Sequence, residues 1–155
     1  MQKYKDLMGS KAEITPHLII SKCNDCTTTE IHQNCISTSE GTFCAPLIKT
    51  TNMTGIDSIR LGLSEICIHR TYKNENNGQK WWAYFNAVVD CHRNNFQPWC
   101  VEAAKRQVGI DFQKIEECIR DEGQILKKDY NLGASVRFPY SPAIVINKQV
   151  YRVLS

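Results

Sequence analysis

The sequence predicts one α/β (α+β) domain, residues 1–155, in which a small sheet ends in a C-terminal β-hairpin and carries a helical insertion at 47–130. Three observations lead to this prediction. Short apolar runs near both ends of the chain have the length of buried strands. Apolar residues at helical spacing recur between those runs. Eight cysteines supply covalent cross-links for a chain of 155 residues.

The N-terminal part is expected to hold one strand and a long cysteine-rich loop. Pro16–Ser21 contains the apolar run His17-Leu-Ile-Ile20 and is predicted to be a short buried strand. Lys22–Pro46 is predicted to be irregular, with a turn at Glu40-Gly41.

Two amphipathic helices follow. Ile56, Ile59, Leu63 and Ile66 recur at helical spacing and predict a helix over about 57–70. A polar loop, Asn74–Gly78, separates it from a second helix over about 80–92. The apolar face of that second helix consists of Trp81, Trp82, Phe85, Val88 and Val89.

A helical hairpin comes next. Pro98 suits a first helical position, and Gly109 is a natural C-terminal stop. Asp111 is expected to cap a second helix that continues to Ile119. A further helix is predicted at Glu122–Tyr130, followed by a loop at Asn131–Tyr140.

The chain ends in a predicted hairpin. A bend at Ser141-Pro142 leads into the strand Ala143–Ile146, and Asn147-Lys148 makes a two-residue turn into the strand Val150–Leu154. A proline directly before a buried strand and a tight hairpin is typical of thioredoxin-like folds, where the bond before that proline is usually cis. The alternative is an ordinary hairpin with a trans proline.

Charge and hydropathy exclude some classes of function. The net charge is +3, with acidic and basic residues interspersed, so no basic face for nucleic acid is present. No apolar run approaches the roughly 18 residues of a membrane span. Met1–Glu13 is polar and lacks the apolar core of a signal peptide.

The cysteines indicate an oxidising compartment. An even number at this density favours about four disulfides and a location in the secretory lumen or outside the cell. Zinc is the competing explanation, but only Cys23-Asn-Asp-Cys26 has ligand-pair spacing, so no metal and no cofactor are expected. Asn52-Met-Thr54 is a glycosylation sequon that fits secretory passage. Since no export signal is visible and the chain stops on a strand, a piece of a larger secretory protein is expected.

Two disulfide pairs are predicted from spacing. Cys100 and Cys118 lie nine residues on either side of Gly109, so an antiparallel hairpin brings them together. Cys67 and Cys91 flank the polar loop and form the second predicted pair. Three connectivities remain open for the other cysteines, which are Cys23, Cys26, Cys35 and Cys44.

Cys23 and Cys26 also permit a catalytic interpretation. A dithiol after a strand and at a helix N-terminus has a lowered first thiol pKa. In that alternative, Cys23 attacks, Cys26 resolves the mixed disulfide, and the Pro142 loop holds the substrate. Asp25 opposes thiolate formation, and Thr27-Thr-Thr29 is a poor helix start. The structural interpretation is therefore favoured.

The adjacent Trp81 and Trp82 permit a ligand platform, because clustered aromatics often anchor interfaces. Core packing is the favoured role. Neighbouring residues on a helix point about 100° apart, so at least one of the two is expected to be less buried.

Six segments, in order, carry a resemblance to a known family. They are Ile14-Thr-Pro-His17, Gly41-Thr-Phe-Cys-Ala-Pro46, Leu63-Ser-Glu-Ile-Cys67, Lys80-Trp-Trp-Ala-Tyr84, Gly109-Ile-Asp111 and the hairpin from Ser141 to Arg152. Together with the cysteines, they resemble the central luminal, thioredoxin-like region of plant-type vacuolar sorting receptors. A fainter similarity to lysosomal thiol reductases lies in Cys100, Cys118, Gly123 and the Pro142 hairpin.

The resemblance implies a type I receptor with a protease-associated domain, EGF repeats and a membrane anchor, all outside this chain. It implies a non-catalytic luminal glycoprotein module that binds soluble cargo or a protein partner during protein transport. A thiol–disulfide oxidoreductase is the alternative. One departure is that Leu47-Ile-Lys49 replaces the family's acidic residues after Pro46. The family's cysteine pair at the usual active-site position is expected upstream of Met1, which would make Cys23 and Cys26 a different pair.

Overall fold

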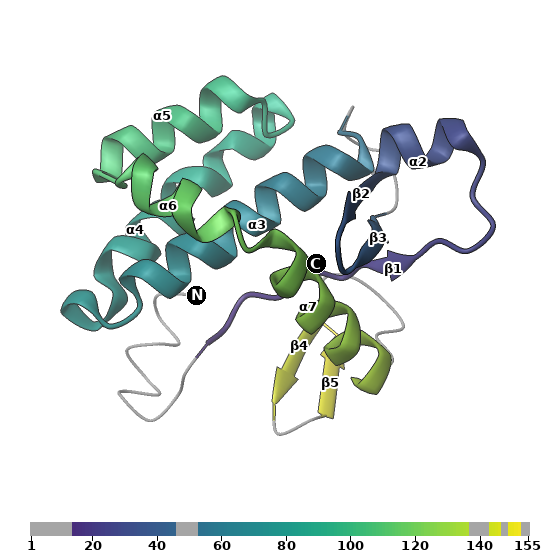
Figure 1. The fold of residues 1–155 in the computed structure, drawn as a ribbon. Coiled ribbons are helices and arrows are strands. Elements are labelled where there is room, and N and C mark those ends of the chain that lie inside the picture. Colours follow the sequence, from purple (N-terminus) through teal and green to yellow (C-terminus); the bar gives the residue numbers. More distant parts are fainter. Residues whose placement is uncertain (1–13, 46–52, 137–142, 147–148, 153–155) are drawn as a thin grey trace. The chain divides into compact units, whose positions relative to one another are not determined.

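The computed structural model describes residues 14–45, 53–136, 143–146 and 149–152. These residues form a mixed α/β fold that is mostly helical (Figure 1). The chain divides into two compact units. The helical unit comprises residues 1–16 and 64–120, and the sheet unit comprises residues 17–63 and 121–155. The predicted single domain, and its insertion at 47–130, stay predictions.

The sheet unit contains a three-stranded antiparallel sheet with the order β1-β3-β2 (Figure 1). Its strands are β1 (Ser21–Lys22), β2 (Cys35–Thr38) and β3 (Gly41–Cys44). The turn predicted at Glu40-Gly41 joins β2 to β3. Residues 23–27 are irregular as predicted, but the irregular prediction is wrong for Lys22, α2, β2 and β3, and Pro46 lies outside the described residues. Only Ser21 of the strand predicted at Pro16–Ser21 pairs with a neighbour.

Helix α2 (Thr28–Asn34) lies in the region predicted to be irregular. Thr27 and Glu30 form a reciprocal capping box, in which the Thr27 N–H donates to Glu30 Oε2 over 2.9 Å and the Glu30 N–H donates to Thr27 Oγ1 over 3.3 Å. The hydrogen bond from the Thr27 backbone lowers the pKa of the Glu30 carboxyl. Thr27 therefore starts a helix, although its β-branched neighbours led to the opposite prediction.

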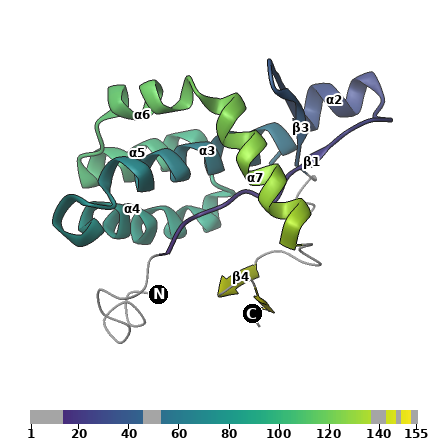
Figure 2. The same ribbon diagram turned by 60° about the horizontal axis from the view of Figure 1, so that its bottom comes forward.

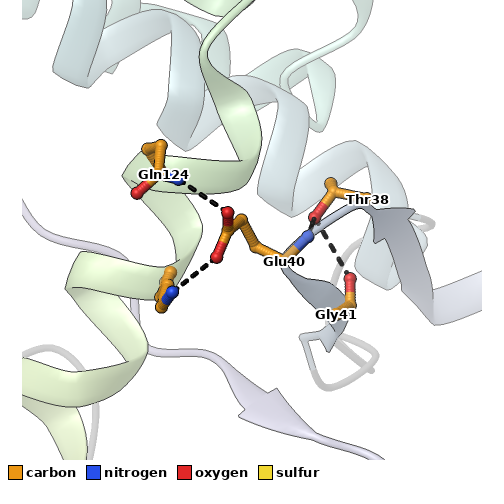
Figure 3. Close-up of polar contacts among 5 residues, drawn as sticks. Thr38, Glu40, Gly41 and Gln124 are labelled. Carbon is orange, nitrogen blue, oxygen red and sulfur yellow. Dashed lines mark hydrogen bonds and ion pairs between the residues drawn. The ribbon is translucent and has the colours of Figure 1, made fainter.

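Helix α7 (Glu122–Val136) packs on strand β3 within the sheet unit. Figure 3 shows Glu40, in the β2–β3 turn, accepting a hydrogen bond from Gln124 Nε2 over 2.7 Å. The second carboxylate oxygen of Glu40 lies 2.6 Å from Lys127 Nζ, and this bond lowers the pKa of Glu40. Gly123 fits here because a side chain would press on Thr38. The turn and the helix are thus held together by polar contacts.

Helix α3 (Gly55–Tyr72) confirms the helix predicted at 57–70 and extends it at both ends. Its first nine residues belong to the sheet unit and the rest to the helical unit. The Gly55 N–H donates to Asn34 Oδ1 over 3.1 Å. A Cβ on Gly55 would collide with the backbone of Asn34 and the carbonyl of Ala45. Glycine is therefore required at this close approach of two backbone segments.

The helical unit continues through η2 (Glu75–Gly78), α4 (Gln79–Val89), η3 (Asp90–Asn94), α5 (Pro98–Val108) and α6 (Phe112–Ile119). Helices α4 and α5 lie side by side (Figure 2). As predicted, Pro98 occupies the first turn of α5, Gly109 ends it with a φ of 74°, and Asp111 caps α6. The Asp111 N–H donates to the Tyr72 hydroxyl over 2.9 Å.

The C-terminal hairpin is confirmed as a pair of strands, and Val153 and Leu154 of the predicted second strand lie outside the described residues. β4 (Ala143–Ile146) pairs antiparallel with β5 (Gln149–Arg152). Asn147-Lys148 and Ser141-Pro142 lie outside the described residues, so the cis bond stays a prediction. Helix α7 continues to Val136, where the sequence predicted a loop from Asn131.

Candidate functional site

All eight cysteines are joined in four disulfides. The helical unit contains Cys67–Cys118 and Cys91–Cys100, so both pairs predicted from spacing are wrong. The prediction counted residues from Gly109 and ignored the rotational phase of each helix. In α5 the buried face contains Val101 and Ala104, and Cys100 lies beside that face, toward η3.

The sheet unit contains Cys23–Cys26 and Cys35–Cys44, which decides among the three connectivities left open. We call these four residues the cysteine corner. Cys23 and Cys26 are half-buried in the loop between β1 and α2. Cys35 and Cys44 are directly opposed partners of β2 and β3 and are buried. The Sγ atoms of Cys23, Cys26 and Cys44 lie within 4.8 Å of one another.

The oxidised corner has limited chemistry. Nucleophilic attack and zinc binding both require a cysteine thiolate. A sulfur held in a disulfide is not a thiolate, so the oxidised corner does neither. Pro142, the third member of the alternative catalytic site, and Asn52, the predicted glycosylation site, lie outside the described residues. Both assignments stay predictions.

The tryptophan pair lies in the core of the helical unit. Trp81 and Trp82 are each 5% exposed, so they do not present a surface platform, and neither is the less buried one expected from helix geometry. Trp81 packs edge-on against His69 with ring centroids 5.0 Å apart. The exposed tryptophan is Trp99, at 62%. The sequence indicates this exposure, because Trp99 does not share the face of α5 that contains Val101 and Ala104.

The helical unit carries a surface groove of about 620 Å³. The groove is lined by η2, α4, the start of η3 and the end of α5, through Glu75, Asn76, Gln79, Lys80, Ala83, Asn86, Ala87, Asp90, Gln107 and Val108. Ala83 and Ala87 are one helical turn apart on α4, and their small side chains leave the space open. Sequence reasoning missed this groove because its residues come from separate elements.

One rim of the groove has an unusual backbone. Asn76, Asn77 and Gly78 have φ values of 46°, 55° and 72°. Left-handed conformations in non-glycine residues cost of order 1 kcal/mol each and persist where the surrounding structure fixes them. Lys80 supports the same edge, since its Nζ lies 3.9 Å from Glu75 Oε1 and 4.8 Å from the centre of the Tyr72 ring. The rim is thus a fixed turn.

A half-buried carboxyl lies elsewhere in the helical unit. Burial raises the pKa of Glu65 on α3 to about 7, and the nearby Lys105 charge opposes this. Burial, and then the Glu65 charge, raise the pKa of Tyr84. The Tyr84 hydroxyl is buried and has no hydrogen-bond partner among the described residues. Glu65 is therefore a proton-binding group near neutral pH.

A fully buried carboxyl belongs to the sheet unit. Asp129 on α7 is 4% exposed and accepts a hydrogen bond from the Leu18 N–H over 2.7 Å. His17 Nδ1 lies 2.8 Å from the other carboxylate oxygen. These contacts fix the segment before β1 against α7.

Replacing Asp129 by alanine is expected to lower the free energy of unfolding by about 2–3 kcal/mol, because the Leu18 N–H loses a charged acceptor. Urea unfolding followed by circular dichroism measures the change. Lys128→Ala, on the exposed face of the same helix, is the control and should change stability by less than about 0.5 kcal/mol. Equal losses in the two variants would contradict the role of Asp129.

Comparison with known proteins identifies the family. The model of the vacuolar sorting receptor thioredoxin-like domain matches residues 3–153. The chain belongs to this family. Vacuolar-sorting receptor 1 of Pisum sativum is 26% identical over 161 residues, which cover 93% of this chain and 26% of the relative. Vacuolar-sorting receptor 5 of Arabidopsis thaliana is 27% identical over 129 residues, covering 74% of this chain and 21% of the relative. No solved structure gives a significant match.

The family match gives the mixed fold its class, a thioredoxin-like domain of the vacuolar sorting receptor type. The chain is a receptor-related luminal module, and its four disulfides are consistent with the secretory pathway. It spans about a quarter of the length of the curated relatives it matches. Among the described residues, every helix is too short or too polar to span a membrane.

Proposed function

We propose that this chain is a non-catalytic luminal module that binds an extended segment of a soluble cargo or partner protein in the groove beside α4. The groove of about 620 Å³ in the helical unit is the observation that carries this proposal. The relatives are named vacuolar-sorting receptors, and this supports a protein as the occupant.

The lining suits a peptide. Ala83 and Ala87 leave room for a chain to lie close to α4. Gln79, Asn86 and Gln107 supply amide groups that both donate and accept hydrogen bonds, as the backbone of an extended peptide requires. Carboxylates and one ammonium group also line the groove. A positively or a negatively charged side chain of the peptide can therefore contact a group of opposite charge.

The walls are held in place before binding. Cys91–Cys100 connects η3, which follows α4, to α5. The left-handed turn at Asn76–Gly78 fixes one rim. A site that is already ordered loses less conformational entropy when a ligand binds.

A peptide selection tests the groove. Twelve-residue peptides are selected from a random library on the folded chain, and their affinity is measured by isothermal titration calorimetry. Ala87→Arg fills the groove and is expected to weaken binding at least tenfold, about 1.4 kcal/mol. Ala103→Arg is the matched control, since Ala103 is an exposed alanine of α5 that does not line the groove. Selected peptides that bind the Ala87→Arg chain unchanged would contradict the proposal.

The thiol–disulfide oxidoreductase is the second candidate function, favoured by the Cys23–Cys26 disulfide in a half-buried loop. It requires turnover on a substrate disulfide. The rate at which dithiothreitol reduces insulin in the presence of the chain distinguishes the two functions. A binding module leaves the rate unchanged, whereas an oxidoreductase accelerates it in a manner abolished by Cys23→Ser.

A further inference from the structure

The cysteine corner places two disulfides against each other. Three sulfur atoms, those of Cys23, Cys26 and Cys44, lie within 4.8 Å of one another, and Cys44 is bonded to Cys35. Thiol–disulfide exchange needs a thiolate that reaches a disulfide sulfur. Once Cys23–Cys26 is opened, the corner holds the attacking sulfur within 4.8 Å of Cys44 Sγ.

We propose that the cysteine corner is a thiol–disulfide exchange site, in which Cys23–Cys26 is opened by a dithiol reductant and then exchanges with Cys35–Cys44. The exposure of the two disulfides sets the order. Cys23 and Cys26 are half-buried in a loop whose neighbouring residues are exposed. Cys35 and Cys44 are 7% and 6% exposed, so an external dithiol reaches the first pair more readily.

The reaction balances in two steps. In the first, the external dithiol transfers two electrons and two protons to Cys23–Cys26 and becomes a disulfide itself. In the second, the thiolate of Cys23 or Cys26 attacks Cys44 Sγ. The Cys35–Cys44 bond breaks, its electron pair leaves on Cys35 Sγ, and Cys35 takes up the proton released by the attacking thiol. The product holds one disulfide and two thiols, and no further oxidant is needed.

The exchange changes what the cross-link connects. Cys35–Cys44 joins the directly opposed partners of β2 and β3. After exchange, Cys44 is bonded to the loop between β1 and α2, and no disulfide joins β2 to β3; the two strands keep their hydrogen bonds and their connecting turn. The exchange therefore transfers a covalent constraint from one edge of the sheet to the other. This inference is independent of the groove and of its occupant.

The helical unit provides an internal control. Cys67–Cys118 and Cys91–Cys100 belong to no comparable cluster of sulfur atoms within the described residues. Opening either of them leaves its thiols without a neighbouring disulfide sulfur at this distance. Exchange is therefore expected in the corner and not in the helical unit.

Single-cysteine variants test the exchange. Cys23→Ser and Cys26→Ser each leave one thiol beside Cys44, and Cys91→Ser leaves Cys100. Each folded variant is incubated at pH 8, labelled with N-ethylmaleimide, quenched with acid and mapped by mass spectrometry without reduction. In at least one corner variant, part of the label is expected on Cys35, with Cys44 bonded to the remaining loop cysteine. In Cys91→Ser, only Cys100 is expected to carry label. Label confined to the remaining loop cysteine in both corner variants overturns the proposal.

The unmutated chain gives a second measurement that does not depend on folding of the variants. Limiting dithiothreitol is added, and the molecules that carry two labels are mapped. A share of them is expected to be labelled on Cys35 and on one of Cys23 and Cys26. Two labels that always fall together on Cys23 and Cys26 contradict the exchange.

Discussion

Replacing Cys67 and Cys118 together by alanine is expected to lower the free energy of unfolding by about 4 kcal/mol. This disulfide joins α3 to α6 across a sequence separation of 51 residues, so it removes a large amount of conformational entropy from the unfolded chain. Cys67 is also fully buried, so its replacement by alanine leaves a cavity that lowers the stability further. The bond is therefore expected to be the main covalent support of the helical unit.

Urea unfolding under non-reducing conditions measures this change. The matched control is the double replacement of Cys91 and Cys100, whose sequence separation is 9 residues. Closing the shorter loop is worth about 3 kcal/mol on the same entropic scale, so the control is expected to lose less stability. A larger loss in the control than in the Cys67 and Cys118 variant would contradict the expected order.

Replacing Glu65 by glutamine is expected to stabilise the chain above pH 7 by up to about 3 kcal/mol. Burial raises the pKa of Glu65 from 4.5 to about 7, so the folded state binds a proton that the unfolded state has already released between these values. Stability from this group is fully present below pH 4.5 and is lost as the pH rises toward 7. Glutamine stays neutral and avoids that loss.

Unfolding at pH 5 and at pH 8 measures the difference. The unmodified chain should lose more stability between these two pH values than Glu65→Gln does. Glu116→Gln, which alters an exposed carboxylate of α6, is the control and should follow the unmodified chain. If Glu65→Gln and the unmodified chain show the same pH dependence, the Glu65 carboxyl is not protonated at neutral pH.

The parts of the fold that local chemistry determines were predictable from the sequence. Pro98, Gly109 and Asp111 act within one helical turn of their own positions, and each occupies its predicted cap. The capping box of Thr27 and Glu30 is equally local and was legible in the sequence. The β-branched Thr28 and Thr29 favour the opposite prediction, but the Thr-x-x-Glu pattern determines the start of this helix.

The parts that tertiary packing determines were not predictable in this way. Disulfide pairing depends on which helix faces meet, and residue spacing does not contain that information for Cys67 and Cys118. Strands β2 and β3 are four residues each, too short for a clear alternation of polar and apolar residues. The groove could not be predicted from the sequence, because η2, α4 and α5 are brought together only in the folded chain.

Nuclear magnetic resonance tests the proposed binding function most directly. The ¹⁵N-labelled chain is titrated with a peptide selected from the random library, and backbone amide shifts are recorded. The largest changes are expected at residues lining the groove, including Gln79, Ala83, Ala87 and Gln107. Changes concentrated at the cysteine corner, or away from the groove, would contradict the assignment of this groove as the binding site.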